Sequence, residues 1–164
     1  MTQLSQTQKK WLKSIHIFAA AIWVSVGSIM FILHFMKKEI QTGDHLYMMN
    51  RILYFMDMKI LVPAAMTCLL TGWIYSQFTK WGYIKYKWLA FKWIITIGII
   101  VLGTIQTGPA LESMVQISKE QGLTALTNPE YIINDNMHIA VGLGMNLILI
   151  TTIFISVFKP GGKR

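Results

Sequence analysis

The chain is poor in cysteine and in charge. It has one cysteine, Cys68, and 13% of its 164 residues are charged, with seven acids against fifteen Lys and Arg. A single cysteine excludes an intrachain disulfide and a Cys-x-x-Cys motif. The sequence also lacks a glycine-rich phosphate loop, a Glu-x-x-His pair, and a serine with both a histidine and a carboxylate nearby. Nucleotide binding, thiol redox chemistry and serine hydrolysis therefore have no support.

Long apolar runs dominate the sequence instead. Hydrophobic residues make up 54% of the chain and concentrate in four stretches, 11–36, 60–78, 88–108 and 138–158. A helix needs about 20 mostly apolar residues to cross ~30 Å of hydrocarbon. The sequence therefore predicts an integral membrane protein with a single transmembrane domain, 1–164. The first stretch is too long for the apolar region of a signal peptide, so we expect an uncleaved first helix.

The basic residues are unevenly distributed along the chain. Ten of the fifteen lie before or in the first turn of the first stretch, between the second stretch and the first turns of the third, or after the fourth. The other five, together with all seven acids, fall on the opposite side of the membrane. The positive-inside rule then places both termini in the cytoplasm, at a bacterial inner membrane. Anionic lipid explains the formal charge of +8 better than nucleic acid does.

Four stretches in series predict an all-α fold, a transmembrane up-and-down four-helix bundle. The outer connections carry helical patterns of their own at 45–58, with Asp44 as the expected cap, and at 111–120. We expect short interfacial helices there, the first lying on the membrane or continuing into the second span. Asn128-Pro129 marks a turn, and Pro63 is expected to kink the second span.

One candidate site lies at the outer end of the bundle. Each span has a stripe of small or polar residues at helical spacing, which we expect to face the interior. These stripes bring His34, Asp57, Gln106 and His138 to comparable depth. Two imidazoles there are able to ligate haem iron from both faces or to share copper or zinc. The alternative is that both histidines bind water or headgroups at the interface.

Methionines favour copper at the same end. Soft thioethers combined with imidazole suit Cu(I). The alternative is that they are apolar filler. They are Met36, Met48, Met49, Met56, Met58, Met114 and Met137.

A second candidate site lies at the inner end, with His16 on the first span and Lys92 on the third. A neutral histidine there is able to ligate haem, and a lysine to hold a propionate or transfer a proton. The alternative for Lys92 is that it extends to the lipid headgroups. His16 and His34 are 18 residues apart, ~27 Å along a helix, so they cannot serve one compact site.

Three segments resemble a bacterial membrane superfamily that includes the CopD copper-resistance proteins and the HemJ-type protoporphyrinogen oxidases. They are WLKSIHIFAAAIW, NRILYFMDMKILVPAAMTCLLTGWIY and WLAFKWIITIGII, together covering roughly residues 10–105. The segments TKWGYIKYKWLAFKW and SVFKPGG resemble more closely a family of uncharacterised bacterial four-helix membrane proteins that end in Lys-Pro-Trp-Gly. Gly161 stands here in place of that Trp.

The resemblance implies a haem b protein. In HemJ-type proteins a first-helix histidine and a third-helix lysine are the functional pair, which correspond by position to His16 and Lys92. Arg51, which lies in the second matching segment, joins the candidate cofactor-binding residues. The resemblance thus implies a site at the inner end, whereas residue spacing favours His34 and His138 at the outer end.

Three hypotheses about function follow. The first is a haem b-binding membrane redox protein, a membrane oxidoreductase whose partner is a quinone or a porphyrin. The second is a copper-handling or permease-like protein that uses the outer methionines and histidines. The third is a cofactor-free membrane module that binds a partner protein. The lipid bilayer is the common partner of all three, and assembly into a homo-oligomer is left open.

Overall fold

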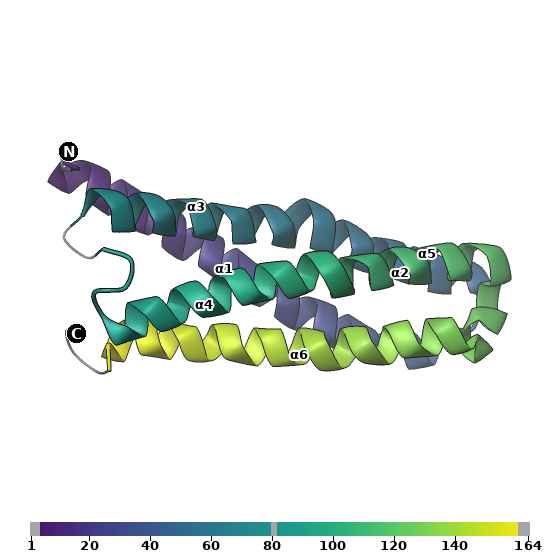
Figure 1. Ribbon diagram of the computed structural model, residues 1–164. Helices are drawn as coiled ribbons and strands as arrows, with labels where there is room; N and C mark the ends of the chain where they lie inside the picture. Colours follow the sequence, from purple (N-terminus) through teal and green to yellow (C-terminus); the bar gives the residue numbers. More distant parts are fainter. Residues whose placement is uncertain (1–3, 80–81, 161–164) are drawn as a thin grey trace.

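The computed structural model of the protein describes residues 4–79 and 82–160 and is an all-α bundle of four long helical rods (Figure 1). Both termini lie at one end of the bundle, which we call the terminal end. Along the chain the helices are α1 (Gln6–Met36), α2 (Gly43–Met56), α3 (Val62–Phe78), α4 (Lys87–Leu102), α5 (Gly108–Gln121) and α6 (Pro129–Phe158). Short 3-10 turns follow α1 at Lys37–Glu39 and α5 at Gly122–Thr127.

Two of the rods consist of two helices joined by a π-helical turn. Asp57–Leu61 joins α2 to α3, and Gly103–Thr107 joins α4 to α5. In each case a proline, Pro63 or Pro109, stands two residues after the turn. A proline has no N–H and its ring clashes with the carbonyl of the residue four positions earlier, so the preceding turn widens. Both rods are therefore continuous helices with a local bulge.

The first outer connection follows one of the two predicted alternatives, continuation into the second span, and the second differs from the predicted separate helix. The pattern at 45–58 is a helix, but it starts at Gly43 with Thr42 as the N-cap rather than Asp44, and it continues into the second span. The pattern at 111–120 likewise continues from the third span. Asn128 caps α6, which begins nine residues before the predicted span start at 138. Lys80, Lys163 and Arg164, which were counted above to assign topology, lie outside the described residues, as does Gly161.

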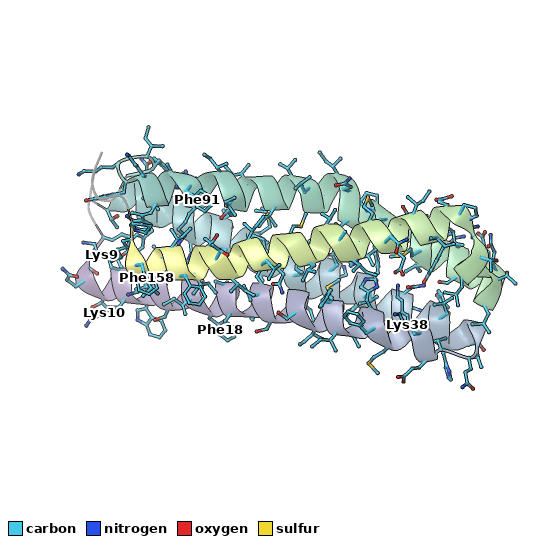
Figure 2. All side chains as sticks on the ribbon, turned by 90° about the horizontal axis from the view of Figure 1, so that it is seen from below. Lys9, Lys10, Phe18, Lys38, Phe91 and Phe158 are labelled. Atoms are coloured by element: carbon cyan, nitrogen blue, oxygen red, sulfur yellow. The ribbon has the colours of Figure 1, made fainter. Side chains whose placement is uncertain are left out.

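The four rods are longer than a membrane requires. The four helices apolar enough to cross a membrane have 30 to 41 residues, or at least ~45 Å at 1.5 Å per residue. The hydrocarbon core is ~30 Å thick. Parts of the rods therefore project beyond it, as expected of a multi-pass membrane protein with a folded extension. Figure 2 shows Lys9 and Lys10 at the terminal end, Lys38 at the other end, and Phe18 and Phe91 on the helices between them.

The extension is a small helical domain at the end opposite the termini, which we call the head. It consists of α2, α5, the turn Gly122–Thr127 and the first turns of α6. A Cβ on Gly43 would lie 2.6 Å from the Gly122 Cα, and Gly122 has a φ of 57°. Only glycine permits such a close backbone approach and such a dihedral angle. This contact fixes the start of α2 against the end of α5.

The rods pack differently in the two halves of the bundle. In the head, α2 lies along α5 over much of its length, and α5 also packs on α6. Between the head and the termini, α1 packs on α3 and α6, and α4 packs on α6. The remaining neighbouring pair, α3 and α4, makes the sparsest contact of the four. The two bulged rods therefore lie close together in the head and diverge below it.

Candidate functional site

A cavity of about 400 Å³ lies at the level of the two π turns. All four rods contribute to its wall, which is mainly apolar. Its buried polar residues are His34, Asp57, Thr107, His138 and Asn146. Ligand pockets typically have volumes of about 300–1,000 Å³, apolar walls and a few placed polar groups. This cavity has the size and composition of a small-molecule site.

The exposed lining residues place the opening of the cavity at its side, between the first π turn with α3 and the second π turn with α5. Met58, Val62 and Met66 line it on one side and are each about 40% exposed. Thr104 and Glu112 line it on the other side and are also exposed. These residues form the rim of the mouth, at the level where the two bulged rods begin to diverge.

His34 on α1 and His138 on α6 contact each other directly in the cavity wall. His34 Nε2 lies 2.7 Å from His138 Nδ1, and the two ring centroids are 4.9 Å apart. Each histidine is only 6% exposed. An iron ion between these two nitrogens would not fit, so bis-histidine ligation of haem by this pair would require the rings to separate. Sequence spacing predicted the pair's common depth, and the structure adds the hydrogen bond.

Asp135 and Lys37 extend this pair toward the head. Asp135 Oδ1 lies 3.1 Å from His34 Nδ1, within ion-pair distance but outside the angular range of a hydrogen bond. The same oxygen accepts a hydrogen bond of 2.6 Å from Lys37 Nζ, which also lies 5.6 Å from the centre of the Tyr131 ring. The Asp135 side chain is 23% exposed. A continuous polar line therefore runs from the cavity wall to the edge of the head.

The neighbouring charges fix where the imidazole protons lie when both rings are neutral. The Asp135 carboxylate stabilises a proton on His34 Nδ1, because this nitrogen is its nearest neighbour in the pair. His34 Nε2 is then an acceptor, and His138 Nδ1 must donate the hydrogen bond between them. This arrangement leaves His138 Nε2 with a free lone pair. Metal-binding and proton-accepting histidines are held by partners in the same way.

Below the histidines, an amide ties two helices together. The Asn146 side chain on α6 lies 2.8 Å from Ser28 Oγ on α1. Asn146 also packs against Gly27, where an added Cβ would approach its Oδ1 to 3.2 Å. Polar side chains that bond across transmembrane helices add to packing by small residues. This contact holds α1 against α6 next to the cavity.

His16, the candidate at the terminal end, is held by Thr71 on α3. His16 Nδ1 lies 2.8 Å from Thr71 Oγ1, and that hydroxyl donates its only hydrogen to the Thr67 carbonyl at 2.6 Å. With the hydroxyl donating to that carbonyl, Nδ1 carries a hydrogen, and in the neutral ring Nε2 is free. Lys92 on α4 is half-buried and within electrostatic range of His16. His16 does not line the cavity described above.

The other predicted residues are distributed over several environments. Asp57 is buried in the cavity wall, as the stripe predicted. Gln106 is exposed on the outside of its rod, so the prediction that it faces the interior was wrong. Thr107 is buried instead, because the π turn adds one residue and rotates the face that follows. Arg51 is exposed on α2, with Nη1 3.4 Å from the Tyr47 hydroxyl, and does not line the cavity.

The seven methionines of the copper hypothesis do not gather in one place. Only Met58 of that set lines the cavity, and Met114 is fully buried in the head. Within residues 4–79 and 82–160, no three His, Cys, Asp or Glu side chains are grouped as metal ligands. The predicted metal pair His34 and His138 is thus present as two imidazoles without a third such ligand.

Sequence reasoning did not identify Asp135 and Lys37 as parts of the site. Both were assigned only to the charge balance of the outer side. The signal was their spacing, since each lies three residues from a histidine: Asp135 precedes His138 on α6, and Lys37 follows His34 at the C-cap of α1. Residues three apart share a helix face. The π turns had no signal beyond the two prolines.

Comparisons with known proteins give no match: no family model, no curated protein and no solved structure is similar to this chain.

Proposed function

We propose that the protein is a redox protein of the bacterial cytoplasmic membrane and that its cavity binds a quinone. The cavity's sideways mouth is the observation that supports this proposal best. A quinone has a flat polar ring and a long apolar tail, and it travels within the bilayer. The mouth between the two bulged rods would admit such a molecule, with the ring in the cavity and the tail among the lipids.

The polar groups of the wall suit a quinone ring. The oxidised ring presents carbonyl oxygens, which accept hydrogen bonds, and the reduced ring presents hydroxyls, which donate them. His138 is able to do either, because imidazole nitrogens accept or donate according to protonation. Asp57 and Thr107 lie in the same wall, each contributed by a π turn. The apolar remainder of the wall excludes water from the ring.

The orientation in the membrane is part of this proposal. The excess of Lys and Arg near the termini supports cytoplasmic termini by the positive-inside rule. The head and the cavity then lie toward the outer face of the membrane. A quinone in the cavity would therefore exchange protons on that side.

Probe binding tests the proposal. A quinol analogue, heptyl-hydroxyquinoline N-oxide, would be titrated against the detergent-purified protein while its fluorescence is recorded. We expect saturable binding that an isoprenoid quinone competes away. No saturable binding to the wild-type protein would overturn the proposal.

Two glycines of α6 offer a matched pair of variants. A Cβ at Gly142 or at Gly144 meets nothing within 4 Å, but only Gly142 lines the cavity. Gly142→Leu places a side chain in the cavity, so we expect probe affinity to fall at least about tenfold, the equivalent of ~1.4 kcal/mol. Gly144→Leu should bind as the wild type does. Equal affinity for both variants would place the probe elsewhere on the protein.

Haem b at the terminal end is the second candidate, and His16 is the residue that supports it. Its Nδ1 donates to Thr71 and leaves Nε2 free, the arrangement usual for a metal-ligating histidine. Lys92 within electrostatic range would hold a propionate, and the family resemblance implies that His16 and Lys92 function as a pair. A bound haem would supply one-electron chemistry, and His16 would supply an axial ligand.

An absorption spectrum tests the haem candidate. Protein made with ample haem should show a Soret band and sharp bands after dithionite reduction. His16→Ala should remove these bands, whereas His45→Ala, at an exposed histidine of the head, should not. A featureless wild-type spectrum would reject this candidate. Loss of the bands in His138→Ala alone would move haem to the cavity.

A further inference from the structure

Three side chains connect the cavity to the head in one line. Both histidines line the cavity, with His138 Nδ1 2.7 Å from His34 Nε2, and Asp135 lies 3.1 Å from His34 Nδ1. Both imidazoles are almost completely buried, whereas the Asp135 side chain is partly exposed. The chain of contacts therefore begins in an apolar space and ends near water.

The resting pair is arranged to accept a proton from the cavity. With the protons placed as derived above, His138 Nε2 carries a free lone pair and His138 Nδ1 donates to His34 Nε2. A hydroxyl that reaches His138 from the cavity thus meets an acceptor. The nitrogen behind that acceptor already shares its hydrogen with the next ring.

We propose that His138 and His34 act as one proton acceptor for the quinol hydroxyl. The O–H bond breaks, its electron pair stays on the oxygen, and an N–H bond forms at His138 Nε2. The N–H bond at His138 Nδ1 breaks as one forms at His34 Nε2. The positive charge therefore ends on the His34 ring, although the proton was taken up at His138. This inference rests on quinone binding to the cavity.

The surroundings favour charge on His34 over charge on His138. A charged imidazole in an apolar cavity is penalised by desolvation. His34 has the Asp135 carboxylate at 3.1 Å as a counter-ion. Lys37 on the 3-10 turn after α1 opposes the charge, but it is itself hydrogen-bonded to Asp135. Asp135 therefore serves both cations.

Other titratable groups face the pair from the neighbouring rods. Asp57 from the first π turn and Glu112 from α5 line the same cavity, as does Tyr54 from α2. Tyr131 of α6 lies beneath Lys37. A charged Asp57 would also favour the protonated pair. Its contribution is measured separately by Asp57→Asn.

Nitrogen NMR of histidine-labelled protein without any ligand tests the inference apart from quinone binding. In the wild type we expect His34 and His138 to take up one proton together, with both rings in the Nδ1–H form before it. Asp135→Asn removes the counter-ion and should move this uptake to lower pH by about one unit or more. Asp44→Asn, at an exposed acid of the head, is the matched control and should not move it.

Two results would overturn the inference. One is independent titration of the two rings, and the other is an Asp135→Asn protein that titrates as the wild type does. The probe titration separates this failure from failure of the proposed function. If the probe binds but the two rings do not titrate together, only the proton-acceptor inference is rejected. If the rings titrate together but the probe does not bind, the quinone site is rejected, and with it the quinol as the proton donor.

Discussion

The head and the transmembrane half of this bundle are built on different packing. The largest fully buried side chains all belong to the head and are Tyr131, Leu46, Leu53, Leu111, Met114, Asn50 and Ser118. The core of the transmembrane half is instead formed mainly by smaller and less completely buried residues, with Trp23 as the largest; they are Ala19, Trp23, Ala64, Ala65, Cys68, Ile99 and Leu149. In the most apolar 18 residues of the third span, only 6% of the residues are buried within the protein, whereas in the corresponding stretch of the second span 28% are.

The difference follows from the two solvents. In water, burial of large apolar side chains drives helices together, so the head needs a closed core. In lipid that driving force is absent, and helices associate through small residues and a few polar contacts. The transmembrane half can therefore leave α3 and α4 apart. The cavity lies at the junction, where rods that the head holds together begin to diverge.

The largest expected effect tests the closed core of the head. Leu53 is fully buried there, and Leu149 is 9% exposed in the transmembrane half. Leu53→Ala should lower the free energy of unfolding by about 2–5 kcal/mol, because it leaves a cavity among rigid neighbours. Leu149→Ala should lower it by less. Denaturant unfolding in detergent measures both, and equal losses would contradict the distinction between the two halves.

The next effect concerns a polar contact inside the head. Asn50 Nδ2 lies 3.1 Å from the Tyr131 hydroxyl, and both residues are fully buried. Asn50→Leu removes this partner and should destabilise the protein by about 1–3 kcal/mol, because the hydroxyl is left unsatisfied. The double variant with Tyr131→Phe should recover part of the loss. If the double variant is as unstable as the sum of the single ones, the hydrogen bond is not the cause.

A smaller effect concerns the junction itself. Pro63→Ala and Pro109→Ala each restore an N–H and remove the clash that widens the preceding turn. We expect the turn to tighten, which rotates Asp57 or Thr107 in the cavity wall and weakens binding of the quinol analogue by a few-fold. Unfolding stability should change little. Unaltered affinity in both variants would show that the π turns persist without the prolines.

The smallest effect compares a helix cap in each half. Thr42 caps α2 in the head and Ser5 caps α1 at the terminal end. In each cap the side-chain oxygen accepts a hydrogen bond from a backbone N–H in the first turn of the helix. Thr42→Ala should cost about 1 kcal/mol, because α2 must form for the head to close. Ser5→Ala should cost less, since the first turn of α1 packs on little. Thermal melting of the two variants in one detergent makes this comparison.

Much of the fold was predictable because its signals are local. Four long apolar stretches identify the spans, and the spacing of His34 and His138 places them at one depth. Continuity of the first rod was one of two predicted alternatives, with Pro63 read as a kink. Continuity of the second rod was not predicted, because the third span was expected to end at 108. Gln106 shows the consequence: a regular helix would bring it inward, but the bulge at Gly103–Thr107 brings Thr107 inward instead.

The site was predictable only in part, for a related reason. A histidine in a span is unusual enough to be noticed from sequence alone. Asp135 lies outside the apolar stretch that begins at 138, so it was assigned to a loop. Its role depends on α6 starting at Pro129, which the sequence marks only by Asn128-Pro129. A helix start misplaced by nine residues therefore separated the carboxylate from the imidazole that it contacts.

The contact between Gly43 and Gly122 limits how this sequence can diverge. Gly43 has no room for a side chain, and the dihedral angle of Gly122 disfavours one. Exposed positions nearby, such as Gln41 and Thr124, carry no such restriction. After random mutagenesis and selection for folded protein, Gly43 and Gly122 should therefore remain unchanged, although they are far apart in sequence and the exposed positions around them vary. Such a pair of conserved glycines in a distant homologue would indicate the same head, even where the spans have lost all recognisable similarity.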